Sequence, residues 1–388
     1  MLNAPEASSR KIAVLTFHAA YNCGAILQAW ALQTVLRRVG LDPTFPDCTK
    51  VGSFRRFDPV WYKPKPKEDA GWLARMWFVI RQELGALGVE DLKRFRFRRF
   101  IRRALNVKAM SVGDIENNFS AVIVGSDQVW NHFITRGETD YFRTTVFADS
   151  TLRRYTYAVS MGDAVPPAEE ARRLAEAAGM FENLSVRENL LPELLDRHGN
   201  HPVVDPDPTL LLTKDDFACV ACPKRLVKGR YLFVYSLVHN AKLWASARTI
   251  AKEMGLKPVL ALAYRYGRGG KIDGGEVDVG VSPDRLLAYV RDADAVISST
   301  FHGTTFPIVY GKRYATFVRA VKDRVSLRCT RLLQSLREEA HRIDDPDDLD
   351  SIRRALAIEA GPEIRETVRT RASEAVGRLK AILSDMQG

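Results

Sequence analysis

Residues 12–17 read Ile-Ala-Val-Leu-Thr-Phe, and residues 25–38 read Ala-Ile-Leu-Gln-Ala-Trp-Ala-Leu-Gln-Thr-Val-Leu-Arg-Arg, with a short polar loop between them. The first run is apolar and favours a strand, while the second has the apolar spacing of a helix. A strand followed directly by a helix is the repeating unit of parallel α/β folds. This stretch therefore predicts a sheet whose strands are connected by helices.

The same unit recurs along the chain. Further predicted strands are residues 121–125, 155–160 and 184–187 and, in a second series, residues 231–235, 258–262 and 295–298. Because parallel sheets are covered by helices on both faces, the two series predict two Rossmann-like, doubly wound α/β domains. Such sheets bind ligands outside the carboxyl ends of their strands, so we expect the two domains to face a cleft that holds the site.

The segment Asp205-Pro206-Asp207-Pro208 separates the two series. Proline restricts its own backbone and that of the preceding residue, which makes this segment a natural domain boundary. We predict an N-terminal Rossmann-like domain over residues 1–205, with a basic, aromatic insertion at 51–110, and a C-terminal Rossmann-like domain over 206–345. The charged remainder, 346–388, favours helix, and we expect it to pack across both domains.

Length and composition are those of a two-domain globular protein, with 388 residues of which 46% are hydrophobic. The opening residues have no signal-peptide pattern, and no run approaches the roughly 18 apolar residues of a membrane helix, so a cytoplasmic protein is expected. The five cysteines are scattered and odd in number. The Cys219–Cys222 pair lacks a second pair or nearby histidines, so neither a disulfide framework nor a metal site is predicted.

Positive charge is concentrated in the insertion. The formal net charge is +11, and residues 51–110 hold 15 Lys/Arg against 6 Asp/Glu, with Trp72, Phe95 and Phe97 among the basic residues. One interpretation is a helical insertion whose aromatics fold onto the domain. Another is a basic amphipathic surface that makes peripheral contact with the anionic inner face of the membrane. A nucleic-acid surface is disfavoured, because no DNA- or RNA-binding motif accompanies the charge.

Polar residues follow several of the predicted strands. The candidate site residues are Asn22, Gly24, Gly125, Ser126, Asp127, Arg187, Ser299, His302, Gly303 and Thr304. Backbone amides and the helix dipole make the first turn after His302 suited to an anion. Gly303 would let the chain approach that anion closely, and the Thr304 hydroxyl would donate to it.

These loops contain five motifs in order. They read Tyr21-Asn22-Cys23-Gly24-Ala25-Ile26-Leu27-Gln28-Ala29, Val124-Gly125-Ser126-Asp127-Gln128-Val129-Trp130-Asn131, Ser185-Val186-Arg187-Glu188, Asp207-Pro208-Thr209-Leu210 and Phe301-His302-Gly303-Thr304. Together they resemble the polysaccharide pyruvyl transferase family over about residues 11–335. Five ordered motifs are much more specific than any one of them alone.

The resemblance implies a fold similar to that of GT-B glycosyltransferases. It also implies phosphoenolpyruvate as donor substrate, with no further cofactor, and a sugar of a lipid-linked or polymeric glycan as acceptor. His302 and Arg187 would hold and activate the donor. The product would be a pyruvate ketal on an exopolysaccharide or another cell-surface glycan.

Two positions depart from the family pattern. Ser299 stands where many relatives have an acidic residue, and Thr300 stands where better-studied relatives have an arginine two residues before the histidine. An anionic group of the donor must then find another cation. Candidate cations are Arg265, Arg268 and Lys271 in a basic, glycine-rich loop, and Lys312 and Arg313.

Ketal formation from phosphoenolpyruvate needs a proton donor, a base for the attacking hydroxyl and a clamp for the donor's anionic groups. We assign these roles to His302, Asp127 and Arg187, respectively. Each has a structural alternative: His302 can satisfy a loop, Asp127 can cap the next helix and Arg187 can pair with Glu188. Trp130 is more typical of a core than of a sugar-stacking platform.

Two other functions stay open. A GT-B glycosyltransferase would hold the diphosphate of a nucleotide sugar in the same cleft, but no acidic residue at a strand end of the second domain is placed to grip its ribose. A non-catalytic glycan- or membrane-binding relative would keep the fold without turnover. The missing arginine at Thr300 favours that alternative, whereas His302, Arg187 and Asp127 argue against it. The sequence leaves the acceptor sugar and the oligomeric state undetermined.

Overall fold

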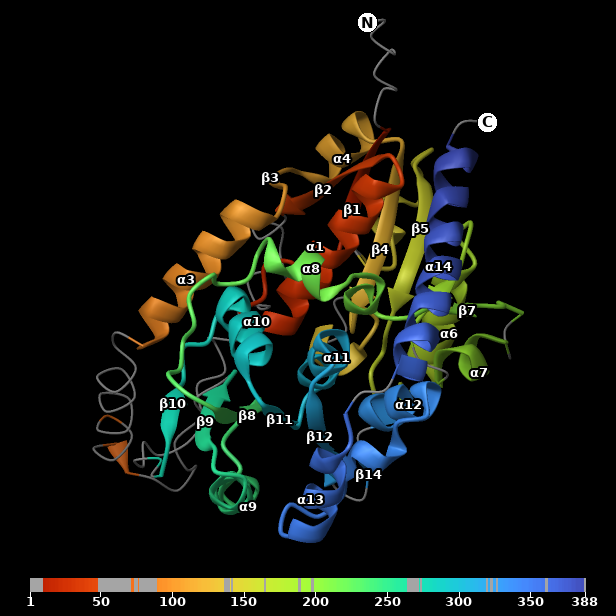
Figure 1. Cartoon of the computed structure of the whole chain (residues 1–388). Helices are drawn as coiled ribbons and strands as arrows, with labels where there is room; N and C mark the ends of the chain where they lie inside the picture. The colour runs from red at the N-terminus through yellow and green to blue at the C-terminus, as the bar shows by residue number, and fades with distance from the viewer. Residues whose placement is uncertain are drawn as a thin grey trace, which may run out of the picture.

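The fold was analysed in a computed structural model. It describes residues 10–47, 71–72, 76, 89–135, 140, 142–163, 165–187, 190–196, 199–263, 272, 274–318, 320–321, 324–325, 327–359 and 362–386. Two parallel sheets organise these residues, and helices lie around both of them (Figure 1).

The first sheet has seven strands in the order β3-β2-β1-β4-β5-β6-β7. The strands are β1 (Arg10–Leu15), β2 (Leu41–Asp47), β3 (Val107–Ala109), β4 (Ala121–Asp127), β5 (Arg153–Val159), β6 (Ser185–Val186) and β7 (Val203–Val204). β4 pairs in parallel with β1 on one side and β5 on the other, and all of its residues are buried. Burial on both faces is the reason its sequence is a nearly continuous apolar run.

The second sheet has six strands in the order β10-β9-β8-β11-β12-β15. The strands are β8 (Tyr231–Ser236), β9 (Lys257–Leu262), β10 (Glu276–Asp278), β11 (Ala295–Ser298), β12 (Arg313–Phe317) and β15 (Arg342–Ile343), with a separate hairpin of β13 (Ala320–Val321) and β14 (Arg324–Val325). Each neighbouring pair of the six is parallel. The prediction of two Rossmann-like α/β domains of the GT-B kind is confirmed, while the proposed domain limits stay predictions.

Helices connect the strands and fill the space between the sheets. They are α1 (Cys23–Arg38), α3 (Val89–Ala104), α4 (Val112–Asn118), α5 (His132–Thr135), α6 (Ala168–Ala178), α7 (Leu190–Asp196), α8 (Lys214–Ala218), α9 (Ala241–Glu253), α10 (Pro283–Asp292), α11 (Phe301–Tyr310), α12 (Leu327–Leu336), α13 (Leu349–Ala357) and α14 (Pro362–Asp385). Short 3₁₀ turns are η3 (Thr145–Phe147), η4 (Pro208–Leu211) and η5 (Glu339–His341).

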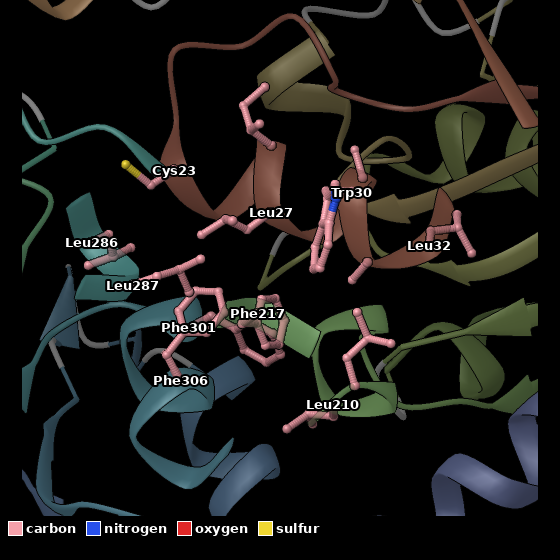
Figure 2. Close-up of a cluster of buried hydrophobic side chains, with 14 of the residues drawn as sticks. Cys23, Leu27, Trp30, Leu32, Leu210, Phe217, Leu286, Leu287, Phe301 and Phe306 are labelled. Atoms are coloured by element: carbon pink, nitrogen blue, oxygen red, sulfur yellow. The ribbon is translucent and has the colours of Figure 1, made fainter. Parts of the chain in front are cut away.

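One hydrophobic core runs from the first sheet to the second. Helix α1 is buried along most of its length. Figure 2 shows its Leu27 and Trp30 side chains opposite Phe217 of α8, Leu287 of α10 and Phe306 of α11, all of which belong to one buried cluster. The two halves are therefore joined by continuous apolar packing rather than by a polar interface.

Helix α3 makes up most of the described part of the basic insertion. Phe97 and Phe100 are buried in the shared core, as the interpretation of a helix folding onto the protein expects. Nζ of Lys93 donates to the carbonyl of Ala263 in the second half at 2.6 Å, and Nε of Arg98 donates to the hydroxyl of Tyr21 in the first at 3.2 Å. Residues 48–70, 73–75 and 77–88 of the chain lie outside the described residues.

The long C-terminal helix α14 runs beside the first sheet (Figure 1). Its Arg378 donates Nε to Asp205 at 3.0 Å, and Arg153 of β5 donates to the carbonyl of Asp385. Ile364, Leu379 and Ile382 enter the shared core. Within the described part of the chain, each helix is too short or too polar to cross a bilayer.

Candidate active site

A cavity of about 270 Å³ lies where loops from the two sheets meet. Its lining residues are Phe17, Ala20, Asn22, Gly24, Ala25, Asp127, Gln128, Ile134, Tyr235, Leu237, Ser299, Thr300, Phe301, His302, Arg328 and Cys329. They come from the carboxyl ends of β1, β4, β8 and β11 and from the start of α12. The cavity therefore occupies the position at which open α/β sheets bind ligands.

The loop after β11 places His302 against this cavity. Helix α11 begins at Phe301, where the hydroxyl of the N-cap Thr300 accepts from the backbone N–H of Gly303 at 2.9 Å. The helix was predicted to begin after His302, but the Thr300 cap makes it begin earlier, at Phe301. His302 consequently lies within the first turn of the helix rather than in a loop.

Asp207 lies behind the His302 ring. Its Oδ2 atom is 3.4 Å from Nε2 of His302 and 2.8 Å from Nη1 of Arg187, and its Oδ1 atom accepts from the backbone N–H of Thr209 at 3.0 Å. Burial alone would raise the pKa of the Asp207 carboxyl, but His302, Arg187 and the Thr209 amide together hold it well below its ordinary value. Asp207 therefore keeps its negative charge inside the protein.

Arg187 continues this buried network toward Asp127. Its Nη2 atom donates to Oγ of Ser160 at 3.1 Å and lies 3.9 Å from Oδ1 of Asp127, while its guanidinium stacks 4.5 Å from the ring centre of Phe301. The network thus connects His302, Asp207, Arg187 and Asp127 in one chain. The predicted alternative partner Glu188 lies outside the described residues.

The other side of the His302 ring packs on Gly24. A Cβ atom added to Gly24 would lie 2.1 Å from Nδ1 of His302, so this position has no room for a side chain. Asn22 positions the glycine, because its side-chain oxygen accepts from the backbone N–H of Gly24 at 2.9 Å and caps α1. Burial raises the pKa of the neighbouring Cys23 thiol to about 12, which disfavours a nucleophilic role for that cysteine.

Asp127 ends β4 with a positive φ of 73°, a conformation uncommon for residues other than glycine. Its Oδ1 atom accepts from the N–H of Gln128 at 2.8 Å, and its side chain lines the cavity. The next helix, α5, begins five residues later at His132, so Asp127 does not cap it. The strained backbone turns this carboxylate toward the cavity.

Four predicted substrate-binding residues lie outside the cavity lining, and packing explains each. Gly125 (φ 118°) leaves no space for a Cβ, which would lie 2.1 Å from the carbonyl oxygen of Tyr157, and Ser126 donates its hydroxyl to Ala158 at 3.0 Å. A Cβ on Gly303 would lie 2.0 Å from Oγ of Ser298. Thr304 donates to the carbonyl of Thr300 within α11. These residues shape the loops that carry the site.

The remaining candidate residues divide between the cavity and the rest of the fold. Ser299 lines the cavity, and its Oγ atom is 2.7 Å from Oγ of Ser236. Lys312 donates to the carbonyl of Ala293, and Arg313 pairs with the exposed Glu359, so both are engaged away from the cavity. Trp130 is buried and donates Nε1 to Phe142, as a core residue does. Arg265, Arg268 and Lys271 lie outside the described residues.

Sequence reasoning missed two functional candidates. Asp207 was interpreted as part of a linker, although its motif had been singled out. Arg328, near the start of α12, is the one Lys or Arg side chain among the described residues that line the cavity. Its Nε atom is 3.9 Å from Oδ2 of Asp163. The sequence carried no signal for Arg328, because α12 lies far from the motifs along the chain.

Comparison with known protein families gave one match. A family model described as polysaccharide pyruvyl transferase matches residues 22–316 of the chain. The range includes His302, Asp207, Arg187, Asp127 and Gly24. The comparison with curated proteins gave no match.

Solved structures share the overall arrangement at low sequence identity. A putative UDP-N-acetylglucosamine 2-epimerase from Listeria monocytogenes is 10% identical, with 97% of this chain and 98% of that chain covered and a TM-score of 0.51. The MnaA–UDP structure from S. aureus is 12% identical, with 97% of each chain covered and a TM-score of 0.49. The glycosyltransferase SnogD from Streptomyces nogalater is 15% identical, with 98% of this chain and 100% of that chain covered and a TM-score of 0.43. The likeness to the Listeria protein supports the two-domain fold and nothing finer.

Proposed function

The chain belongs to the polysaccharide pyruvyl transferase family, and from that premise we propose that it transfers the enolpyruvyl group of phosphoenolpyruvate to two hydroxyl groups of a glycan sugar. The product is a pyruvate ketal on a cell-surface polysaccharide or its precursor. The observation that carries the proposal is the buried His302–Asp207–Arg187 chain at the wall of a polar cavity.

The reaction adds one hydroxyl and then a second to the central carbon of the donor. A proton goes to the methylene carbon, which becomes a methyl group, and the first sugar oxygen bonds to the cationic central carbon. The second sugar oxygen then displaces phosphate from that carbon. Each hydroxyl loses its proton, so the balance is one ketal and one inorganic phosphate from one donor and one diol.

His302 is suited to deliver the proton. Asp207 is 3.4 Å from Nε2 and holds a proton there, so delivery of a proton from Nδ1 uses the imidazolium ion, which carries one proton on each ring nitrogen. Nδ1 makes no hydrogen bond among the described residues and lies beside Gly24, a cavity-lining residue. In this arrangement Nδ1, and not Nε2, is the ring nitrogen that faces the reactants.

Asp127 and Arg187 have different tasks in this proposal. The Asp127 carboxylate lines the cavity and can accept the proton of an attacking hydroxyl. Arg187 is almost fully buried and holds Asp207 while its other nitrogen lies 3.9 Å from Asp127. We therefore assign Arg187 to positioning the two carboxylates, in place of the predicted direct grip on the donor.

The donor's negative charge needs a cation on the cavity side. Arg328 meets this need, since it lines the cavity that Thr300 also lines without offering a charge. The N-terminal turn of α11 adds a favourable dipole at the same wall. Arg328 thus supplies the charge that relatives provide from the position of Thr300.

The test supplies the purified chain with phosphoenolpyruvate and a panel of glycan acceptors. We expect phosphate to be released only in the presence of an acceptor, and the acceptor to gain the mass of a pyruvate ketal. His302→Asn is the matched inactive variant. Nucleotide release from a UDP- or GDP-sugar would overturn the proposal in favour of a glycosyltransferase, and failure of the folded chain to bind phosphoenolpyruvate would favour the non-catalytic alternative.

A further inference from the structure

A second cavity of about 270 Å³ adjoins the first. Its walls come from the segment that contains Asp205 and Asp207, from α12 and from α14. Phe301 and Arg328 line both cavities, so the two are neighbours that share a wall.

Arginine dominates the second cavity. Its lining contains Arg187, Arg328, Arg331, Arg371 and Arg378. The acidic residues in the same lining are Asp205, Asp207 and Glu374. Positive side chains therefore outnumber negative ones.

Two of the three acidic residues are already occupied. Asp207 is paired with Arg187 at 2.8 Å, and Asp205 accepts from Arg378 and from the hydroxyl of Ser185 at 2.5 Å. Arg328 pairs at 3.9 Å with Asp163, which lies outside the lining. Arg331 and Arg371 then face the exposed Glu374 alone within the lining. The cavity keeps an excess of positive charge after its internal ion pairs are formed.

Arg331 carries part of this excess charge and has a nitrogen without a hydrogen-bond partner in the described part of the chain. Its Nη1 atom is buried and has no hydrogen-bond partner among the described residues. A buried guanidinium nitrogen without a partner is costly. Arg331 as a whole is only partly buried and lines the cavity, so an anion there would offset this cost through the rest of the guanidinium. Arg371 of α14 lines the same cavity and makes no ion pair with a described residue.

We propose that the second cavity is a subsite for a phosphate group carried by the acceptor, held by Arg331 and Arg371. Guanidinium groups match the geometry of phosphate oxygens, and a shared wall with the first cavity sets the phosphate next to the reacting sugar. The assignment to the acceptor rests on the proposed function, whereas the phosphate site itself does not. Phosphorylated glycans would then be preferred over the same glycans without phosphate.

Binding of inorganic pyrophosphate tests the site independently of catalysis. Calorimetric titration of the full chain, with phosphoenolpyruvate present to occupy the first cavity, should show binding that weakens about tenfold in Arg331→Gln and in Arg371→Gln, the scale of one lost charge-assisted hydrogen bond. Arg369→Gln is the matched control, because Arg369 lies on the same helix and pairs with the exposed Glu366. Equal affinity in wild type and both cavity variants would overturn the site.

A second arm tests the source of the phosphate. A sugar diphosphate, the matching sugar without phosphate, and orthophosphate are titrated against wild type and Arg371→Gln. Tighter binding of the sugar diphosphate than of the other two, with the difference reduced in Arg371→Gln, supports an acceptor subsite. Orthophosphate binding as tightly as the sugar diphosphate would overturn the acceptor assignment and indicate a product site. Loss of phosphoenolpyruvate turnover with these binding results intact would count against the proposed function alone.

Discussion

The His302 ring packs directly against Gly24, since a Cβ atom there would lie 2.1 Å from Nδ1 and 2.5 Å from Cγ of the imidazole. Gly24 lies in α1, which follows a strand of the first sheet, and His302 lies in α11, which follows a strand of the second sheet. Asp207 lies at the opposite side of the ring. Orientation of His302 is thus set jointly by the two halves of the molecule. The glycine is required by this contact and not by a turn.

We expect Gly24→Ala to reduce turnover about 100-fold, because a displacement of about 1 Å at a catalytic group has that scale of effect. The methyl group cannot enter without moving the ring. Gly377→Ala on α14 is the control, since a Cβ there meets no atom within 4 Å, and alanine should stabilise that helix by about 0.5–1 kcal/mol. Steady-state rates and thermal melts of both variants provide the comparison; full activity in Gly24→Ala would contradict the contact.

Asp207→Asn should both inactivate and destabilise the protein. The substitution removes the carboxylate that lies 2.8 Å from the buried Arg187 guanidinium, and breaking a buried ion pair in this way typically costs about 3–5 kcal/mol. Urea unfolding at neutral pH measures the loss. Asp347→Asn is the control, because Asp347 and Lys242 form an exposed pair whose removal should leave stability unchanged.

The difference in unfolding free energy between wild type and Asp207→Asn should depend on pH in a defined way. The folded pKa of Asp207 lies well below its ordinary value of 3.8, so its stabilising charge is fully present above that value and is lost as the pH falls toward the folded pKa. The gap between wild type and Asp207→Asn should be constant from about pH 5 to 8 and narrow below about pH 4. A gap that widened in acid would refute the assignment of Asp207 as an ionised partner.

Arg328→Gln should weaken phosphoenolpyruvate binding by about ten- to hundredfold, as expected for the loss of a charged hydrogen-bond donor to an anion. Arg342→Gln is the control, because Arg342 pairs with the exposed Asp344 away from the cavity. Fluorescence or calorimetric titration with the donor measures both. Wild-type affinity in Arg328→Gln would mean that another cation, from outside the described residues, holds the donor.

His18 should make the fold sensitive to mild acid. Burial lowers its pKa to about 4 from the ordinary 6.5, despite the hydrogen bond between Nδ1 and the Thr16 carbonyl at 3.0 Å. The unfolded chain therefore binds the extra proton first, and stability should fall by about 3 kcal/mol between pH 6.5 and pH 4. His18→Gln should flatten this slope in urea unfolding, whereas His201→Gln, at an exposed position, should preserve it.

We still propose that the basic region contacts an anionic membrane, and the burial of side chains on α3 limits which of them can take part in that contact. Phe97 and Phe100 are buried, whereas Phe95 is 59% exposed and Leu92 is 44% exposed. Co-sedimentation with anionic vesicles should occur at low salt and fade at high salt, since exposed charges are screened over about 8 Å at physiological ionic strength. Phe95→Ser should weaken it, and Phe133→Ser, at a 63% exposed phenylalanine on α5, should not. Sedimentation that is absent at both salt levels would leave α3 with a purely structural role.

The fold was predictable because its signals are local. The strands predicted over residues 12–17 and 121–125 are apolar runs that polar loops follow, and they overlap β1 (Arg10–Leu15) and β4 (Ala121–Asp127) at the centre of the first sheet. The start of α11 was misjudged because the sequence Ser-Ser-Thr-Phe-His offers several capping residues, and only the bond from Gly303 to Thr300 selects one.

The site was predictable only in part, because its geometry depends on pairs that are distant in sequence. His302, Asp127, Asn22 and Gly24 follow strands, and the rule for α/β sheets places them at the cavity. Asp207 could not be predicted as a site residue, because only the folded structure places η4, which Asp207 caps, beside α11. Gly303 and Gly125 were interpreted as ligand contacts, yet a glycine required by packing and one required by a ligand look the same in a single sequence.

The contacts of α3 and α1 have a consequence for how reactants reach the cavity. Two halves with a polar interface commonly move as rigid bodies, but here Lys93 donates across the boundary from a nearly buried position, and Leu27 packs on the apolar residues of the other half. A hinge opening would break the hydrogen bond from the Lys93 ammonium group to the Ala263 carbonyl and expose the apolar residues around Leu27 to water. We therefore expect donor and product to exchange through rearrangement of the short loops that follow Asp127 and that carry Ser299, while the two sheets keep their relative position.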